Sequence, residues 1–326
     1  MTVGQSGGDR AVASGLGAVV MWGLAPVFTR SAVTEIGPLT LLVLRALIAG
    51  LVCLPLCVRT LKNIARTHLA RLVIAGLLGM VGYTLPVAFG LRSVPSSIAA
   101  LILATEPIWI MCLGRVFAKE HVAFWAWIAS ALAMCGVAAV IGPSLGVEAG
   151  GRMLVGLGLV TVGTILFGAY TIVLRPLSQV YGSTAATTAS TLIGALPYLV
   201  FAGLAAPHRM AGVTAGVWGD IAFLAVGSSV AGMLLWNRSV TRMGSTKAGL
   251  LLFLEPLIGV AGGIVLLGEH FSLESAVGGL LVVVGVVMAW LAQRRRTEAD
   301  VRPGSSTSAA VPDWCPSDQL SEGVLP

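Results

Sequence analysis

Long runs of apolar residues, separated by short polar connections, repeat along most of the 326-residue chain. A helix that crosses a bilayer needs about 20 mostly apolar residues, whereas a transmembrane β-barrel needs strict alternation of apolar and polar positions, which these runs lack. The pattern therefore predicts an all-α polytopic membrane protein with ten transmembrane helices. The predicted spans are residues 11–30, 39–58, 70–90, 97–117, 122–142, 153–174, 184–206, 217–237, 246–267 and 272–292.

The composition agrees with this pattern. Only 10% of the residues are charged, 56% are hydrophobic and the mean hydropathy is +0.93, whereas soluble domains carry about 25% charged residues. We therefore expect an integral protein of the plasma (inner) membrane that has the lipid bilayer as a partner. The net charge of +6 comes largely from short loops, and no nucleic-acid-binding motif is present, so nucleic acid is not an expected partner.

The distribution of Lys and Arg predicts the orientation. Ten spans put both termini on one side of the membrane, and the loops and ends on that side carry 14 Lys and Arg residues, against 4 on the other side. Because Lys and Arg concentrate in cytoplasmic loops, we expect both termini to be cytoplasmic. Residues 1–10 then form a cytoplasmic N-terminus. Residues 293–326 are polar and rich in Pro and Ser, which predicts a disordered cytoplasmic tail.

An internal repeat relates the two halves of the chain. The aligned pairs are Glu106–Pro107 with Glu255–Pro256 and Glu120 with Glu269, at an offset of 149 residues, and Trp22–Gly23 with Phe167–Gly168, at an offset of 145. Each half, residues 11–142 and 153–292, contains five spans, so the second half enters the membrane from the opposite side. The sequence thus predicts two inverted five-helix repeats, a plan of many secondary transporters with the substrate site near the midplane. A duplication could also serve only to build a stable bundle.

Two Glu-Pro pairs lie near the middle of predicted spans. An unpaired carboxylate at that depth costs at least about 2.5–3.5 kcal/mol, so Glu106 and Glu255 are expected to face the interior of the bundle or a wet cavity. Pro107 and Pro256 lack an N–H and free a carbonyl in the preceding turn, which makes a polar notch in a bent helix. The carboxylate could carry a proton or bind a cation, or it could be structural and fix the bend.

Other polar and aromatic side chains within the spans are candidates for the same central cavity. Arg45 could extend to the interface, attract an anionic substrate or pair with a glutamate. Tyr83 and Trp109 lie deep in their spans, and Trp109 shares a helix face with the glutamate three residues before it. Trp22 and Tyr170 complete the candidate set.

Glu120 and Glu269 each follow a Glu-Pro glutamate by 14 residues, or about 21 Å along a helix. They are therefore expected at opposite membrane interfaces, where each would begin or cap the next helix.

The second half carries a recognisable family pattern. The run LLWNRSVTRMGSTKAGLLLFLEPLIGVAGGIVLLGEHFS (234–272), with its LEP and LGE motifs, resembles the end of the third and the start of the fourth helix of an EamA-type repeat. The run SSIAALILATEPIWIMCLGRVFAKE (96–120) is similar to it, although Lys119 replaces the usual glycine. The resemblance covers residues 11–292 and implies a ten-helix member of the drug/metabolite transporter (DMT) superfamily. Members move small metabolites such as amino acids and purines, often outward, and many are thought to use the proton gradient.

We therefore expect a secondary active exporter of small metabolites, amino-acid-like or other small polar compounds, that works by alternating access; proton coupling is left open. A facilitative or importing transporter of the same fold is the alternative within transport. An integral membrane enzyme would need clustered His, Asp or metal ligands, but the four histidines are scattered over different loops; a non-transport scaffold is the other alternative. No catalytic residue, metal site or cofactor is predicted, and the protein could be a monomer or a homodimer.

Overall fold

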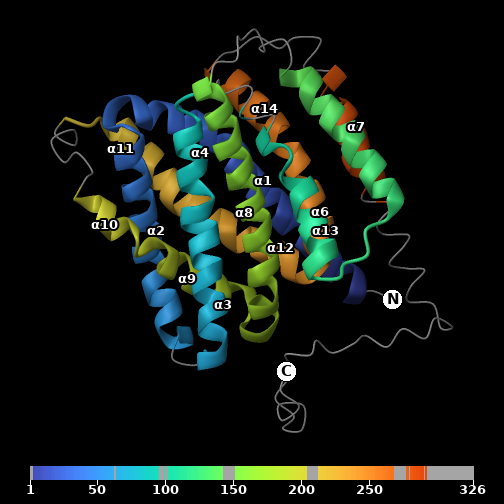
Figure 1. The fold of residues 1–326 in the computed structure, drawn as a ribbon, viewed down its shortest axis with the longest axis horizontal. Helices are drawn as coiled ribbons and strands as arrows, with labels where there is room; N and C mark the ends of the chain where they lie inside the picture. Colours follow the sequence, from blue (N-terminus) through green and yellow to red (C-terminus); the bar gives the residue numbers. More distant parts are fainter. Residues whose placement is uncertain are drawn as a thin grey trace.

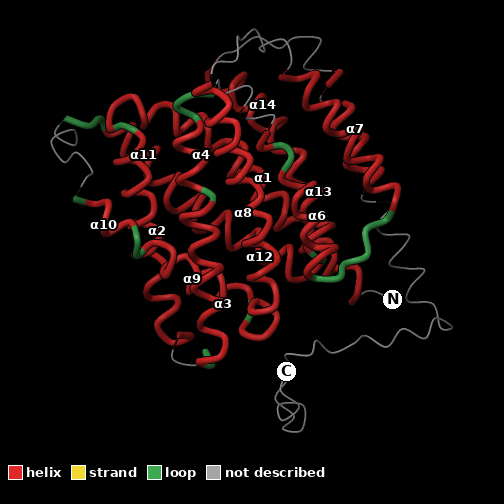
Figure 2. The backbone as a smooth tube through the Cα atoms, in the orientation of Figure 1, coloured by secondary structure: helices red, strands yellow, loops and turns green. Residues whose placement is uncertain are grey.

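The computed structural model describes residues 3–61, 64–94, 99, 102–141, 151–203, 212–267, 277–278, 280–289 and 291, and the predicted tail lies outside them. Every regular element in this part of the chain is helical, as Figure 2 shows. The α-helices are α1 (Val3–Ile36), α2 (Pro38–Leu61), α3 (Arg66–Gly76), α4 (Thr84–Gly90), α6 (Glu106–Phe117), α7 (Phe124–Ile141), α8 (Gly151–Tyr181), α9 (Ser183–Ala195), α10 (Tyr198–Ala202), α11 (Ala215–Ala222), α12 (Met233–Met243), α13 (Ser245–Leu250) and α14 (Glu255–Leu267). Residues 280–289 are also helical.

Each predicted span contains helix in its described residues. Five helical stretches are long and apolar enough to cross a membrane, namely Gly8–Val33, Pro38–Cys57, Arg66–Gly90, Gly151–Tyr181 and Ala215–Met243. The other predicted spans contain shorter helices: 122–142 holds α7, 184–206 holds α9 and α10, and 246–267 holds α13 and α14 joined by a 3₁₀ segment. The chain is an all-α membrane protein, as the hydropathy pattern predicted.

Two of the long stretches change to π-helical geometry in their middle. The segment η1 (Leu77–Gly82) separates α3 from α4, and η4 (Phe223–Gly232) separates α11 from α12. These are the third and eighth predicted spans, so the two π-helical segments occupy equivalent places in the predicted repeats. Because π-helical turns are rare and occur frequently at functional sites, these segments make the interior of the bundle the candidate region for a functional site.

Glycines bring several helices into direct backbone contact. α3 packs on α9, and a Cβ atom added to Gly194 would lie 2.2 Å from the carbonyl oxygen of Gly76. At the edge of the bundle in Figure 1, α7 packs against residues 280–289, where a Cβ added to Gly136 or to Gly285 would lie 2.7 Å from backbone of the other helix. Helix association in a membrane depends on such close packing, so these glycines set the distances between the helices.

The middle of the bundle is occupied by α8. It contacts α3, α4 and α6 from the first predicted half and α9 and α12 from the second, and Figure 1 shows it near the centre of the view. The residues that α8 buries therefore lie where the two predicted halves meet.

The connections between helices gather at two ends of the bundle. At one end, the Tyr181 hydroxyl accepts a hydrogen bond from the Ala65 N–H (3.1 Å), and Glu120 accepts one from the Ser245 N–H (3.1 Å). At the other end, Glu35 accepts one from the Thr214 hydroxyl (3.1 Å). The first end contains four connections, those that follow α2, α6, α8 and α12. The charge bias predicts that all four are cytoplasmic, and a chain of ten spans would place them on one side of the membrane.

Candidate functional site

Both Glu-Pro pairs stand at helix starts inside the bundle. Glu106 begins α6 after a turn, and Glu255 begins α14 after the 3₁₀ segment η5 (Leu251–Leu254). A proline in the first turn of a helix loses nothing by lacking an N–H, so Pro107 and Pro256 mark new helix starts in the middle of their spans. The positive ends of both helix dipoles are therefore directed at the carboxyl groups.

Two glycines hold these helix starts against the opposite half. α14 packs on α1, where a Cβ added to Gly23 would lie 2.8 Å from the Glu255 carbonyl oxygen. α6 packs on α8, where a Cβ added to Gly168 would lie 3.4 Å from the Ile110 nitrogen. The two glycines are partners in the sequence repeat, so each half supports the Glu-Pro helix of the other. Both carboxyl groups are thereby brought to the junction of the halves.

The two carboxyl groups share one polar neighbourhood. Glu106 is 4% exposed and Glu255 is half-buried, and they are close enough to interact electrostatically. The Tyr83 hydroxyl is close enough to Glu106, Glu255 and Arg45 to interact with them electrostatically. In the described part of the chain, the Oε1 atom of Glu106 is buried without a hydrogen-bond partner. The site therefore combines acidic and basic groups with an unfilled hydrogen-bond acceptor.

Arg45 lies half-buried on α2 and is bound to a π-helical segment. Its Nε atom donates to the Ser229 hydroxyl (2.5 Å), and its Nη2 atom donates to the Ser228 hydroxyl (3.1 Å). Ser229 donates in turn to the Leu224 carbonyl oxygen (2.9 Å). Both serines belong to η4, so the guanidinium group links the second span of the first half to the eighth span of the chain.

An aromatic cluster stands beside the charged groups, with Phe167 of α8 at its centre. Its ring centroid lies 5.5 Å from that of Trp22, 5.2 Å from Tyr83, 6.0 Å from Tyr170 and 5.9 Å from Trp236. The Trp22 and Phe167 rings meet edge to face, the geometry that aromatic pairs prefer. The cluster forms a largely aromatic surface where the two halves meet.

The remaining sequence candidates have partners of their own. The Tyr170 hydroxyl accepts a hydrogen bond from the Asn237 amide (2.6 Å), and the Trp22 indole donates to the Ser228 carbonyl oxygen (3.0 Å). The Trp109 indole donates to the hydroxyl of Thr105 in the preceding turn (3.1 Å).

The sequence candidates did not include several residues of this neighbourhood, namely Phe167, Tyr198, Ser228, Ser229 and Trp236. Tyr198 lies in electrostatic range of Arg45 and donates to the Met80 carbonyl oxygen (2.8 Å). The alignment of Phe167 with Trp22 in the repeat could have indicated the first. The serines carry no such signal, because small polar residues are common in the packed faces of membrane helices.

A second polar cluster centres on Glu120, which lies in the connection between α6 and α7. Its carboxylate accepts hydrogen bonds from the Ser245 N–H (3.1 Å) and hydroxyl (2.6 Å) and from the Thr246 N–H (3.0 Å) and hydroxyl (2.6 Å). It also forms an ion pair with Arg175 of α8. Glu120 was expected to begin or cap the next helix, α7. The structure instead has it cap α13, whose first N–H groups need an acceptor.

The Glu120 cluster gives stability that depends on pH. Burial acts to raise the pKa of Glu120, but Arg175 and the hydrogen bonds from Ser245 and Thr246 outweigh it and lower the pKa below the ordinary 4.5. The stabilisation is therefore fully present above pH 4.5 and is lost as the pH falls through the lowered pKa. We expect Glu120→Gln to lower the free energy of unfolding by about 2 kcal/mol above that pH. Thermal unfolding of both proteins across the acid range should show the difference shrinking at low pH; a difference that does not change with pH would contradict the assignment.

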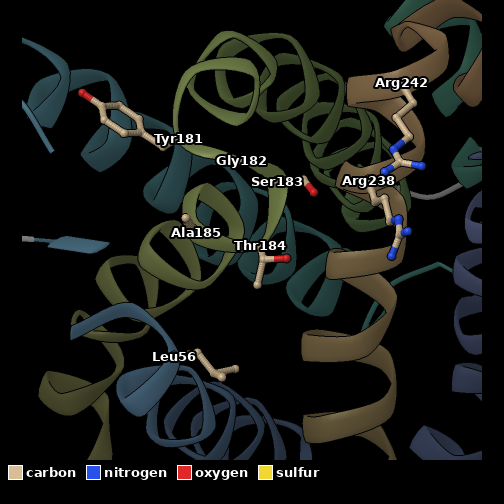
Figure 3. Close-up of a pocket in the computed structure, with 8 residues that line it drawn as sticks. All are labelled: Leu56, Tyr181, Gly182, Ser183, Thr184, Ala185, Arg238 and Arg242. Atoms are coloured by element: carbon tan, nitrogen blue, oxygen red, sulfur yellow. The ribbon is translucent and has the colours of Figure 1, made fainter. Parts of the chain in front are cut away.

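A cavity of about 540 Å³ lies at the same end of the bundle as Glu120. It is lined by the turn between α8 and α9, by the end of α12 and by one residue of α2; these residues are Leu56, Tyr181, Gly182, Ser183, Thr184, Ala185, Arg238 and Arg242. Figure 3 shows the Ser183 and Thr184 hydroxyls directed toward α12, which carries both arginines.

Comparison with known proteins assigns the chain to a family. The model of the EamA-like transporter family matches it twice, over residues 9–142 and 154–291. The chain belongs to the EamA-like transporter family. This EamA-like protein is therefore an integral membrane transporter of the DMT superfamily, whose substrate is a small molecule.

Individual relatives agree with this assignment. An uncharacterized transporter of Archaeoglobus fulgidus is 25% identical over 268 residues, which span 82% of the EamA-like chain and 94% of the relative. A protein of Streptantibioticus cattleyicolor, named "Probable terminal-alkyne amino-acid exporter", is 27% identical over 223 residues, 68% of this chain and 72% of the relative. A protein of known crystal structure, 18% identical, superposes with a TM-score of 0.73 over 88% of this chain and 99% of its own, which supports the fold.

Proposed function

We propose that this EamA-like protein exports small polar metabolites, with amino-acid-like solutes as the first candidates, by alternating access between two inverted halves. The observation that carries the proposal is the placement of Glu106 and Glu255 at two helix starts, within electrostatic range of each other and each held by a glycine of the opposite half. A motion of one half against the other changes the surroundings of both carboxyl groups. The relative named as an amino-acid exporter supports the direction and the substrate class.

The neighbourhood of these carboxyl groups suits a small solute that carries both a positive and a negative charge. Glu106 has a buried acceptor atom without a partner in the described residues, which could accept a hydrogen bond from an ammonium group. The guanidinium group of Arg45 could attract a carboxylate, since its present partners are neutral hydroxyls. The aromatic cluster around Phe167 offers apolar contact to the rest of the solute. Discontinuous helices whose ends are directed at substrate are a common plan for transporter sites.

Glu255 is the better candidate for a proton carrier. It is half-buried, whereas Glu106 is almost completely buried beside Tyr83. A carrier must change its surroundings during the transport cycle, and we assign this role to Glu255 as the less buried of the two carboxyl groups. Glu106 then serves mainly to hold the bend and bind the solute. The chain would exchange one proton for one solute.

The export proposal is tested by profiling metabolites outside cells. Cells that express the wild type are compared with cells that express the Glu106→Gln/Glu255→Gln double variant at equal membrane abundance, and with cells that carry no copy. We expect one class of small polar metabolites to accumulate outside only with the wild type. If all three profiles agree, the export proposal fails, and uptake of labelled amino acids by the same cells then decides whether the chain imports instead.

A further inference from the structure

The same tripeptide begins two helices at one end of the bundle. Gly-Ser-Thr occupies residues 182–184 before α9 and residues 244–246 before α13. Gly182 has φ +84° and ψ 146°, and Gly244 has φ +88° and ψ 156°. This left-handed conformation favours glycine. Because both glycines adopt it with nearly the same angles, the two turns present their Ser and Thr residues to the surroundings in the same way.

At 244–246 the structure shows what such a turn binds. Both N–H groups and both hydroxyls of Ser245 and Thr246 donate to the two oxygens of the Glu120 carboxylate. Arg175 adds an ion pair to one of these oxygens. The carboxylate is thus held by four hydrogen bonds, a helix N-terminus and one guanidinium group, a combination of groups that binds anions strongly.

At 182–184 the corresponding groups face the 540 Å³ cavity instead of a carboxylate of the protein. Among the described residues that line this cavity there is no Asp or Glu, while two are arginines, Arg238 and Arg242. Among the residues that the structure describes, no hydrogen bond or ion pair engages the side chains of Ser183, Arg238 or Arg242. Gly182, the N-cap residue of α9, has no side chain that could cap the first N–H groups of this helix. The cavity therefore has the donors of the Glu120 site and a larger positive charge.

We propose that this cavity binds the carboxylate of a solute, and that it is the cytoplasmic access site from which a carboxylate-bearing substrate proceeds to the central cavity. This rests on the proposed export function. The volume of the cavity lies within the range of small-molecule sites, and the Leu56 side chain offers apolar contact to the carbon skeleton of the solute. The first turn of α9 binds the carboxylate as α13 binds Glu120, and Arg238 and Arg242 neutralise its charge. The charge bias of the loops predicts that this end is cytoplasmic.

The test measures binding directly, so that it does not depend on transport. The full-length protein is placed in nanodiscs of neutral lipid, and its thermal unfolding is followed at increasing concentrations of isovalerate, a carboxylate with a branched apolar tail. Isovaleramide is the neutral control, and all samples have equal ionic strength. Binding to the folded protein raises the unfolding midpoint with concentration. We expect a saturable rise with isovalerate and none with isovaleramide.

Two double variants with the same loss of charge locate the site. Arg238→Gln/Arg242→Gln is expected to weaken isovalerate binding by at least about tenfold, or roughly 1.4 kcal/mol. Arg66→Gln/Arg115→Gln removes two exposed charges from the same predicted side, outside the cavity, and should bind as the wild type does. A third variant, Ser183→Ala/Thr184→Ala, should also weaken binding while leaving the arginines in place.

Three outcomes would overturn the proposal. The first is equal stabilisation by isovalerate and isovaleramide, or by neither; the second is an equal loss of binding in the two arginine variants. The third is the disappearance of the isovalerate effect in nanodiscs that contain phosphatidylglycerol, which would assign the cavity to a lipid phosphate. None of these binding results bears on the export experiment with whole cells. Failure of the access site can therefore be distinguished from failure of the export function.

Discussion

Replacing Glu255 by glutamine is expected to abolish proton-driven accumulation of substrate in proteoliposomes. With a lumen about one pH unit more acidic than the outside and one proton exchanged per solute, the wild type should accumulate the metabolite identified by export profiling about tenfold, because one unit corresponds to about 1.4 kcal/mol. Glu255→Gln keeps the shape of the side chain but cannot release a proton. It should bring the solute only to equal concentrations on both sides, whereas Glu106→Gln should keep the tenfold accumulation and reach it more slowly.

Two controls separate loss of coupling from loss of folding. Exchange of labelled for unlabelled solute needs no gradient, so Glu255→Gln should retain it if the solute site is intact. Asp9→Asn changes an exposed carboxylate near the start of α1 and should behave as the wild type in both assays. Full gradient-driven accumulation by Glu255→Gln would show that this residue does not carry the proton.

Gly194→Ala is expected to destabilise the protein strongly. The new Cβ atom would lie 2.2 Å from the carbonyl oxygen of Gly76 and 2.7 Å from the Cβ of Met80. Because the first contact is with backbone, no rotation of a side chain relieves it, and α9 must move away from α3. Overpacking of this kind costs about 3 kcal/mol. The unfolding midpoint in nanodiscs and the yield of folded protein in the membrane should both fall.

Gly158→Ala is the matched control. Gly158 also lies within a helix, α8, but a Cβ atom added there meets nothing within 4 Å. Alanine should be neutral there or should stabilise the helix by about 0.5–1 kcal/mol, because glycine is the poorer helix former. Equal stability of the two variants would show that α3 and α9 can separate without cost.

The charged groups of the central site differ in how far the sequence could predict them. A glutamate followed by proline inside an apolar run is rare, and the two copies at a constant offset made Glu106 and Glu255 visible as candidates. The partners of Arg45 were not visible, since Ser228 and Ser229 are 183 and 184 residues away. Whether Arg45 extends to the interface or is bound inside depends on which helix lies opposite it.

The sequence by itself determined the class of the protein, its helices and its family. These follow from local properties: the length of an apolar run decides whether a segment can span a bilayer, and short motifs identify the family. Only the tertiary structure decided which polar groups meet, because the partner of a side chain depends on how helices cross. Glu120 therefore caps α13, 125 residues away, and not the helix that follows it. For the same reason, the Gly-Ser-Thr turn at 182–184 faces a cavity with two arginines, whereas its twin at 244–246 is closed by a carboxylate of the chain.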